Sequence, residues 1–174
     1  MAENWPEELN RAAIRWREGD PEAAFEVWGL CGERLMRIAR VAAGGEAVAD
    51  DAVQEAFIRA WRHIDRYDAE RPFGPWITAI LIRECRRSRA RSLRQRVIPL
   101  QPRQSAGRGE LMDAVDRLPA PLRATIALHY LEGYDVRETA SLTGVPEGTV
   151  KSRLHRARTL LARYLEEGDP DETK

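Results

Sequence analysis

Apolar residues recur at intervals of three and four along most of this 174-residue chain. Residues 21–41 and residues 46–64 each carry one such stripe, and the pair Gly44-Gly45 separates them. The stripes comprise Phe25, Trp28, Leu35, Ile38 and Ala42 in the first stretch, and Ala49, Val53, Phe57, Ala60 and Ile64, flanked by Trp61, in the second. This period is that of an amphipathic helix. The sequence lacks the alternation with a period of two that a half-buried strand requires, so the pattern predicts an all-α protein.

A third helix is expected after the loop of residues 66–75, which contains two prolines and a glycine. It should begin near Pro75 or Trp76 and reach about Leu93. Ile77, Ile80, Leu81 and Glu84 fall along one face of it. Residues 93–110 then hold two prolines, two glycines and no apolar period, which is typical of a linker.

A second helical block follows this linker. Residues 111–118 form a short amphipathic stretch, and prolines open the helix after it. Asp135 is a favourable N-cap for the next helix, and Glu138 three residues later completes a capping box. The last helix is expected over residues 147–165. The chain should therefore contain two small helical domains, divided as an N-terminal extension or helix (1–20), a first domain (21–92), a flexible linker (93–110), a second domain (111–168) and a tail (169–174).

The last two helices have the spacing of a helix-turn-helix. Two helices that cross steeply over a short turn need a small residue at the crossing. Ala140 fills this position, Gly144 suits the turn because glycine adopts left-handed dihedrals, and Val150 faces back toward the first helix. The opposite face of the last helix carries Ser152, His155, Arg156 and Thr159, flanked by Lys151 and Arg158. Such a face can enter the major groove of DNA, and the alternative is a solvated face beside a three-helix core.

The net charge of the chain is zero, but the charges are unevenly distributed. Residues 1–80 carry a net charge of −5, residues 81–110 carry +7 and residues 111–174 carry −2. The basic segment holds Arg83, Arg86, Arg87, Arg89, Arg91, Arg94 and Arg96. This density predicts an anionic partner. Tyr67, Phe73 and Trp76 precede it and could stack on unpaired bases, although Phe73 and Trp76 could instead fill a small core.

Several function classes are excluded. No apolar run approaches the roughly 20 residues of a membrane span, and the N-terminus lacks the apolar core of a signal peptide. We therefore expect a cytoplasmic protein without membrane insertion. Cys31 and Cys85 are expected as buried reduced thiols, and His63, His129 and His155 have no metal-ligand spacing. Because a phosphate-binding glycine loop is also missing from the sequence, we expect no enzyme activity, no cofactor and no metal site.

Two stretches resemble one known family. Residues 49–80, ADDAVQEAFIRAWRHIDRYDAERPFGPWITAI, resemble region two of bacterial sigma factors. Residues 118–165, LPAPLRATIALHYLEGYDVRETASLTGVPEGTVKSRLHRARTLLARYL, resemble region four. The short linker leaves no room for a middle domain. In this respect the chain resembles the extracytoplasmic-function (ECF) group of sigma factors. The resemblance implies a factor that binds core RNA polymerase, recognises the minus-thirty-five and minus-ten elements of promoter DNA, initiates transcription and is held by an anti-sigma factor.

The resemblance also implies a role for particular residues. The polymerase would be bound by Asp50, Asp51, Gln54, Glu55, Phe57 and Trp61. The minus-ten element would be bound by Tyr67, Phe73, Trp76, Arg83, Arg86 and Arg87. The minus-thirty-five element would be bound by Thr149, Lys151, Ser152, Arg153, His155 and Arg156. Family members usually carry Asn and then Asp at the positions of Arg83 and Arg87, so this chain adds positive charge there.

Two other functions remain open at this point. A sigma-like decoy would bind an anti-sigma factor through the same surfaces and never initiate transcription, and the unusual Arg83 and Arg87 favour it. An ordinary DNA-binding regulator with a helical sensor domain would leave the DDAVQEAF helix unexplained.

The length of the linker limits how the two domains can work. The linker spans at most about 60 Å when extended and about 23 Å as a coil. Two promoter elements two helical turns apart are separated by roughly 70 Å, and each small domain adds about 25–30 Å. The linker therefore suffices only when it is partly extended. We expect the free protein to be compact and to bind promoter duplex poorly.

Overall fold

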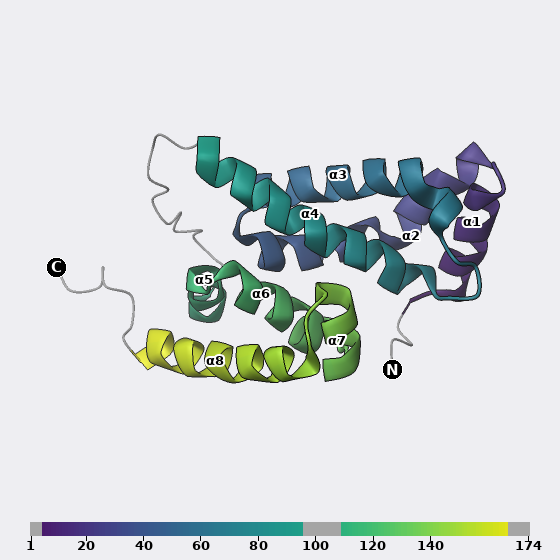
Figure 1. Ribbon diagram of the computed structural model, residues 1–174. Coiled ribbons are helices and arrows are strands. Elements are labelled where there is room, and N and C mark those ends of the chain that lie inside the picture. The colour runs from purple at the N-terminus through teal and green to yellow at the C-terminus, as the bar shows by residue number, and fades with distance from the viewer. Residues whose placement is uncertain (1–4, 96–108, 167–174) are drawn as a thin grey trace.

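The computed structural model describes residues 5–95 and 109–166, and these residues form helices and no strand (Figure 1). We call residues 5–95 the N-terminal module and residues 109–166 the C-terminal module. The N-terminal module comprises α1 (Glu7–Arg17), α2 (Pro21–Ala39), the π-helical turn η1 (Arg40–Gly44), α3 (Glu46–His63), the 3₁₀ turn η2 (Ile64–Arg66) and α4 (Phe73–Gln95). The C-terminal module comprises α5 (Glu110–Arg117), α6 (Ala120–Ile126), the π-helical turn η3 (Ala127–Leu131), α7 (Val136–Thr143) and α8 (Glu147–Glu166). The all-α prediction is confirmed.

The helix ends follow from local chemistry. Asp20 caps α2 because its carboxylate accepts hydrogen bonds from the backbone N–H groups of Glu22 and Ala23. α4 begins at Phe73, two residues before the earlier of its two expected starts. The side-chain oxygen of Asn10 accepts the Phe73 N–H at 2.8 Å, so a residue distant in sequence supplies the partner that this helix end needs.

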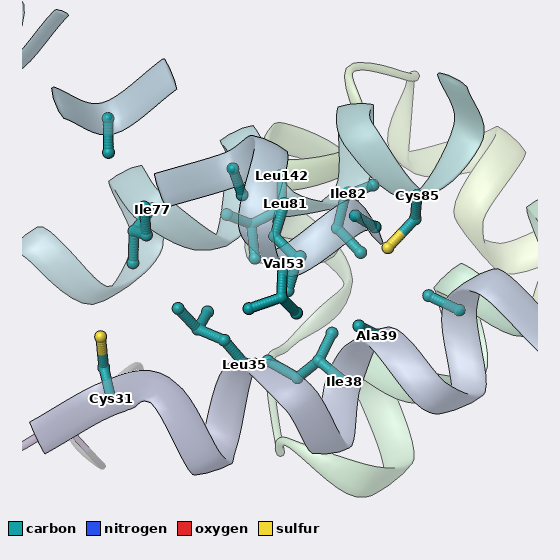
Figure 2. Close-up of a cluster of buried hydrophobic side chains, with 14 of the residues drawn as sticks. Cys31, Leu35, Ile38, Ala39, Val53, Ile77, Leu81, Ile82, Cys85 and Leu142 are labelled. Carbon is teal, nitrogen blue, oxygen red and sulfur yellow. The ribbon is translucent and has the colours of Figure 1, made fainter. Parts of the chain in front are cut away.

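The N-terminal module packs around an inner line of α2 that differs from the expected stripe. Phe25 and Trp28 are 77% and 47% exposed, so the prediction that they face the core is wrong. The buried line consists of Ala23, Ala24, Val27, Cys31, Leu35 and Ile38. These smaller side chains allow α2 to approach α3 and α4 closely, and Figure 2 shows Leu35 and Ile38 beside Val53 and Leu81.

The helix-turn-helix forms as the sequence predicts. Asp135 and Glu138 make both hydrogen bonds of the capping box at the start of α7. Gly144 ends α7 with φ 68° and ψ 38°, in the left-handed region. Ala140 and Val150 are 8% and 0% exposed and belong to one small hydrophobic cluster with Leu154.

The two modules pack against each other. α7 lies against α4, and α6 lies against η1 (Figure 1). The largest hydrophobic cluster crosses this boundary, because it contains Leu81 of α4 together with Leu128, Tyr134 and Leu142 of the C-terminal module. Figure 2 shows Leu142 among the side chains of the N-terminal module. The two modules are therefore packed together, as expected for the free protein.

Both cysteines are buried, as expected from the sequence. Burial raises the pKa of the Cys31 thiol and of the Cys85 thiol to about 12. Within the described ranges, no helix is long and apolar enough to cross a membrane. In the same part of the chain, no three His, Cys, Asp or Glu side chains gather in a group that could hold a metal ion.

Candidate nucleic-acid and protein-binding surfaces

The outer face of α8 presents the residues expected at the minus-thirty-five element. Val150, Leu154 and Ala157 are buried on the inner side and hold α8 against the other helices of the C-terminal module. The outer side carries Lys151, Ser152, His155 and Arg156, which are all exposed, with Thr149 and Arg153 half-buried beside them. The helix is therefore anchored along one side and free to place the other side in a major groove.

A basic groove lies between α3 and α4. Its volume is about 230 Å³, and its lining comprises Arg59, His63, Arg66, Trp76, Ile80, Arg83, Glu84 and Arg87. Four arginines outnumber the one carboxylate, so the groove attracts anions. We call it the minus-ten groove because it contains Trp76, Arg83 and Arg87.

Glu84 is a buried carboxylate in the lining of this groove, and it pairs with two of the arginines. Its side chain is only 2% exposed. Arg59 Nε and Arg87 Nη1 each lie 2.6 Å from the same oxygen, Glu84 Oε1. Two guanidinium groups from different helices are therefore held against one carboxylate oxygen in the lining of the groove. The sequence placed Glu84 on the same face of its helix as Ile77 and Leu81 but gave no sign that Arg59 would reach it.

The aromatic loop residues are placed differently from the sequence expectation. Tyr67 and Phe73 are 1% and 0% exposed, so their rings are not accessible for stacking on bases in this conformation. Burial also raises the pKa of the Tyr67 hydroxyl, which donates a hydrogen bond to the Arg71 carbonyl at 2.6 Å. The Phe73 ring lies 5.3 Å from the Trp76 ring and supports it. The interpretation of Phe73 as a core residue is confirmed, and only Trp76 of the three rings lines the groove.

The residues expected to bind polymerase share one side of α3. Asp50, Asp51 and Gln54 are exposed, Glu55 and Phe57 are half-buried, and Trp61 is 54% exposed. Asp51, Gln54 and Glu55 line a hollow of about 440 Å³ together with Ser88, Arg91 and Ser92 of α4. This combination of carboxylates, an amide and exposed apolar rings fits a protein partner better than a nucleic acid.

Sequence reasoning missed an aromatic extension of this surface. The Trp28 and Phe57 rings meet edge to face, with centroids 4.7 Å apart. Phe25 lies three residues before Trp28, so it sits on the same side of α2. Both α2 rings fall near the apolar stripe of residues 21–41, but the buried line of α2 runs through the smaller Val27 and Cys31.

Comparisons with known proteins agree with this arrangement. The chain matches the family Sigma-70 region 2 over residues 30–96 and the family Sigma-70, region 4 over residues 108–161. It is 32% identical over 155 residues to the ECF RNA polymerase sigma factor SigM of Mycobacterium tuberculosis, covering 84% of this chain and 79% of SigM. It is 33% identical over 147 residues to SigL of the same organism, covering 76% of this chain and 83% of SigL.

Two solved structures share the fold over most of both chains. One is CnrH in complex with the cytosolic domain of CnrY, with a TM-score of 0.68, 25% identity, and coverage of 92% of this chain and 98% of that one. The other is the sigma factor RpoE in complex with the anti-sigma factor NepR from Bartonella quintana, with a TM-score of 0.65, 25% identity, and coverage of 81% and 95%. The chain therefore belongs to the ECF family of RNA polymerase sigma factors, as its two motifs predicted.

Proposed function

We propose that this chain binds core RNA polymerase through α3, directs it to promoters and opens them, with no catalytic group of its own. The observation that carries this proposal is the presence of separate surfaces on one chain. An anchored helix-turn-helix exposes a basic face, a tryptophan-bearing groove collects arginines, and α3 exposes an acidic and aromatic side. A transcription factor of this kind acts in the cytoplasm, where polymerase works.

At the minus-thirty-five element, α8 enters the major groove of duplex DNA. Arg153 and Arg156 offer the bidentate N–H pattern that matches guanine, while Lys151 and Ser152 contact phosphates or base edges. The assignment is supported by the exposure of Lys151, Ser152 and Arg156 and by the rigid apolar anchor behind them.

At the minus-ten element, the groove between α3 and α4 binds one unpaired strand. Extruding a base costs a few kcal/mol, and stacking on Trp76 offsets part of this cost. The guanidinium groups of Arg59, Arg83 and Arg87 neutralise the neighbouring phosphates. Arg86 extends the same basic surface along α4.

The polymerase is bound by the exposed side of α3. Asp51 and Gln54 supply polar contacts, and the exposed rings of Trp28 and Trp61 supply apolar area of the kind that anchors protein interfaces. An anti-sigma factor is the second protein partner that we propose, because RpoE, which shares this fold, is solved in complex with one.

Transcription with purified core polymerase on a library of random promoters tests the proposal and determines the promoter sequence. We expect the double substitution Asp51→Ala, Gln54→Ala to weaken binding of core polymerase at least tenfold, because both side chains are exposed and serve no visible structural purpose. Asp113→Asn on the exposed side of α5 is the matched control and should bind normally.

Two outcomes would contradict the proposal. Transcripts absent with wild-type protein, although core polymerase binds, would favour the sigma-like decoy. Failure of the wild-type chain to bind core polymerase at all would favour a DNA-binding regulator of another kind.

A further inference from the structure

The first turn of α4 is held by residues from the start of the chain. The side-chain oxygen of Asn10 in α1 accepts the backbone N–H of Phe73 at 2.8 Å. Trp5, just before α1, lies against Gly74, because a Cβ on this glycine would be 2.3 Å from Trp5 Cδ1. The first N–H groups of a helix have no partner inside the helix, so a side chain that accepts one of them helps to fix where the helix begins. The N-terminal segment therefore contributes to the placement of α4.

Trp16 brings a ring from α1 to the same place. It is buried, and its ring centroid lies 6.2 Å from that of Phe73. The Phe73 ring is buried in turn and lies 5.3 Å from the ring of Trp76. Trp76 is half-buried and lines the minus-ten groove. A continuous row of rings therefore leads from α1, through the start of α4, to the groove.

Tyr67 completes the aromatic support of Trp76. Its ring lies 5.1 Å from that of Phe73, edge to face, and 5.6 Å from that of Trp76. The Tyr67 hydroxyl donates to the Arg71 carbonyl at 2.6 Å, which closes the loop before α4 on itself. Two buried rings therefore pack against Trp76, while part of its own ring stays accessible from the groove.

We propose that Asn10 and Trp16 of α1 are positioning residues for promoter opening. They hold Phe73, and through it they orient the Trp76 ring on which the extruded base stacks. α1 lies before residue 30, where the match to Sigma-70 region 2 begins, so this assignment adds an element that the family match does not include. The inference rests on the proposed function, because it requires an unpaired base on Trp76.

The orientation of Trp76 matters because stacking depends on how the ring and the base are placed. Stacking of one base strengthens binding by about 5- to 150-fold. A binding group that is displaced by about 1 Å loses much of its effect, so the residues behind it determine how much of this gain is realised. A ring that is already ordered in the free chain also avoids the loss of side-chain entropy on binding. The contacts of α1 supply this order before DNA arrives.

Asn10→Ala is the sharpest test, because it removes one hydrogen-bond acceptor and leaves every ring in place. We expect binding of holoenzyme to a DNA fork with an unpaired minus-ten strand to weaken about 3- to 10-fold, which is part of the loss expected for the whole stack. Binding to minus-thirty-five duplex and to core polymerase should be unchanged. Asn10→Asp retains an oxygen acceptor at the same position and should restore the wild-type affinity.

Two further measurements separate positioning from a general loss of stability. The fluorescence of 2-aminopurine at the extruded position is quenched by stacking, so quenching should decrease in Asn10→Ala and return in Asn10→Asp. The double variant Asn10→Ala, Trp76→Ala should bind the fork no more weakly than Trp76→Ala alone, because a positioning residue has no effect once the group that it positions is gone. Losses that add in the double variant would overturn the proposal.

Asp20→Ala is the matched control, since it removes the cap of another helix in the same module. The Asp20 carboxylate accepts the N–H groups of Glu22 and Ala23 at 3.0 and 3.4 Å. Asp20→Ala and Asn10→Ala should each lower the midpoint of thermal unfolding by about 2–4 °C. Only Asn10→Ala should weaken fork binding. An equal loss of fork binding in both variants would show that stability alone is responsible, and the proposal would be wrong.

Trp16 is tested by Trp16→Leu and Trp16→Phe. Leucine fills apolar space without a ring, so we expect fork binding to weaken at least threefold, whereas phenylalanine keeps a ring against Phe73 and should recover most of the affinity. The Trp16 ring also lies 5.7 Å from that of Trp61, which is on the proposed polymerase-binding side of α3. The affinity for core polymerase is therefore measured in parallel. A loss confined to polymerase binding would overturn the role of Trp16 at the groove.

Hydrogen exchange in the free chain separates this inference from the proposed function. The Phe73 amide should exchange about tenfold faster in Asn10→Ala and slow again in Asn10→Asp, because local opening exposes it. Unchanged exchange, or unchanged fork binding when Trp76→Ala weakens it, would overturn the role of α1 and leave the proposed function standing. Faster exchange in a chain that does not bind core polymerase would overturn the proposed function, while the effect of Asn10 on α4 would stand.

Discussion

Among single residues, Glu84 has the largest influence on the proposed minus-ten groove. Its buried carboxylate pairs with Arg59 and Arg87, and both arginines line the same groove. The departure of Arg87 from the family pattern thereby gains a physical explanation, because it pairs with Glu84 three residues earlier. The family resemblance predicts Arg87 as a DNA contact. The ion pair between Glu84 and Arg59 could not be predicted, because Arg59 comes from another helix.

Glu84→Gln tests this positioning. We expect promoter opening, followed by permanganate reactivity of unpaired thymines, to fall about tenfold while binding of minus-thirty-five duplex is unchanged. The free energy of unfolding should fall by about 1–3 kcal/mol, because a buried acceptor loses charged partners. Glu26→Gln, which removes a half-exposed ion pair with Arg15, is the control. Normal promoter opening by Glu84→Gln would contradict the proposal that Glu84 positions Arg59 and Arg87.

Trp76 should act through its ring alone. Stacking on one base contributes about 1–3 kcal/mol, so Trp76→Ala should weaken binding of holoenzyme to a DNA fork by about 5- to 150-fold. Trp76→Phe retains a ring and should recover much of the affinity. Tyr130→Ala, at an exposed ring of the C-terminal module, should have no effect. The idea is wrong if the alanine and phenylalanine variants bind equally well, as measured by equilibrium competition.

At the scale of elements, local signals were reliable and packing preferences were less so. The capping box of α7, the glycine at the end of α7 and the break before α3 were all predicted, because each depends on neighbouring residues. The π-helical turns η1 and η3 were not predicted, and neither was the exposure of Phe25 and Trp28. These features depend on what the rest of the chain places against each helix.

The exposed face of α8 gives a prediction at this scale. Arg156→Ala should weaken binding of holoenzyme to minus-thirty-five duplex by about 1–3 kcal/mol if it contacts a base, and should relax sequence preference at one position. If it contacts only a phosphate, binding should weaken equally on all sequences and the salt dependence should decrease. Arg137→Ala, exposed on α7, is the control. Unchanged affinity and unchanged preference would remove Arg156 from the interface.

In the whole molecule, the main hydrophobic cluster joins two modules that the sequence treats as separate domains. The linker length indicated that the free chain could be compact, but no pattern in the sequence identified Arg123 or Glu132 as inter-module contacts. Such contacts connect residues about 80 to 98 positions apart, which local periodicity does not report. The domain boundaries themselves stay predictions.

The cysteines provide a chemical measure of this packing. Because burial raises the pKa of both thiols to about 12, their thiolate fraction at pH 8 is very small and alkylation should be slow. Below pH 9 both thiols are protonated in the folded and in the unfolded chain, so they leave the free energy of unfolding independent of pH. From pH 9 to 12 only the thiols of the unfolded chain ionise, so the free energy of unfolding falls as the pH rises.

Loosening the contact between the two modules should affect the two thiols differently. Cys85 lies close enough to Arg123 to feel its charge, whereas Cys31 lies within the N-terminal module. In Gly44→Ala the added Cβ would lie 2.6 Å from Arg123 Cζ, so it should loosen the packing of the C-terminal module on η1. We expect iodoacetamide to alkylate Cys85 of this variant faster at pH 8, with little change at Cys31, as followed by mass spectrometry of the peptides. Equal rates at Cys85 in the variant and the wild-type protein would show that this side of α4 stays covered.

Arg86 of α4 joins the two modules, because its Nη2 donates a hydrogen bond to the Thr143 carbonyl at the end of α7 at 2.5 Å. A guanidinium has five N–H donors, so Arg86 can hold this carbonyl and still bind a phosphate. One side chain would then connect the nucleic acid at α4 to the backbone of the helix-turn-helix.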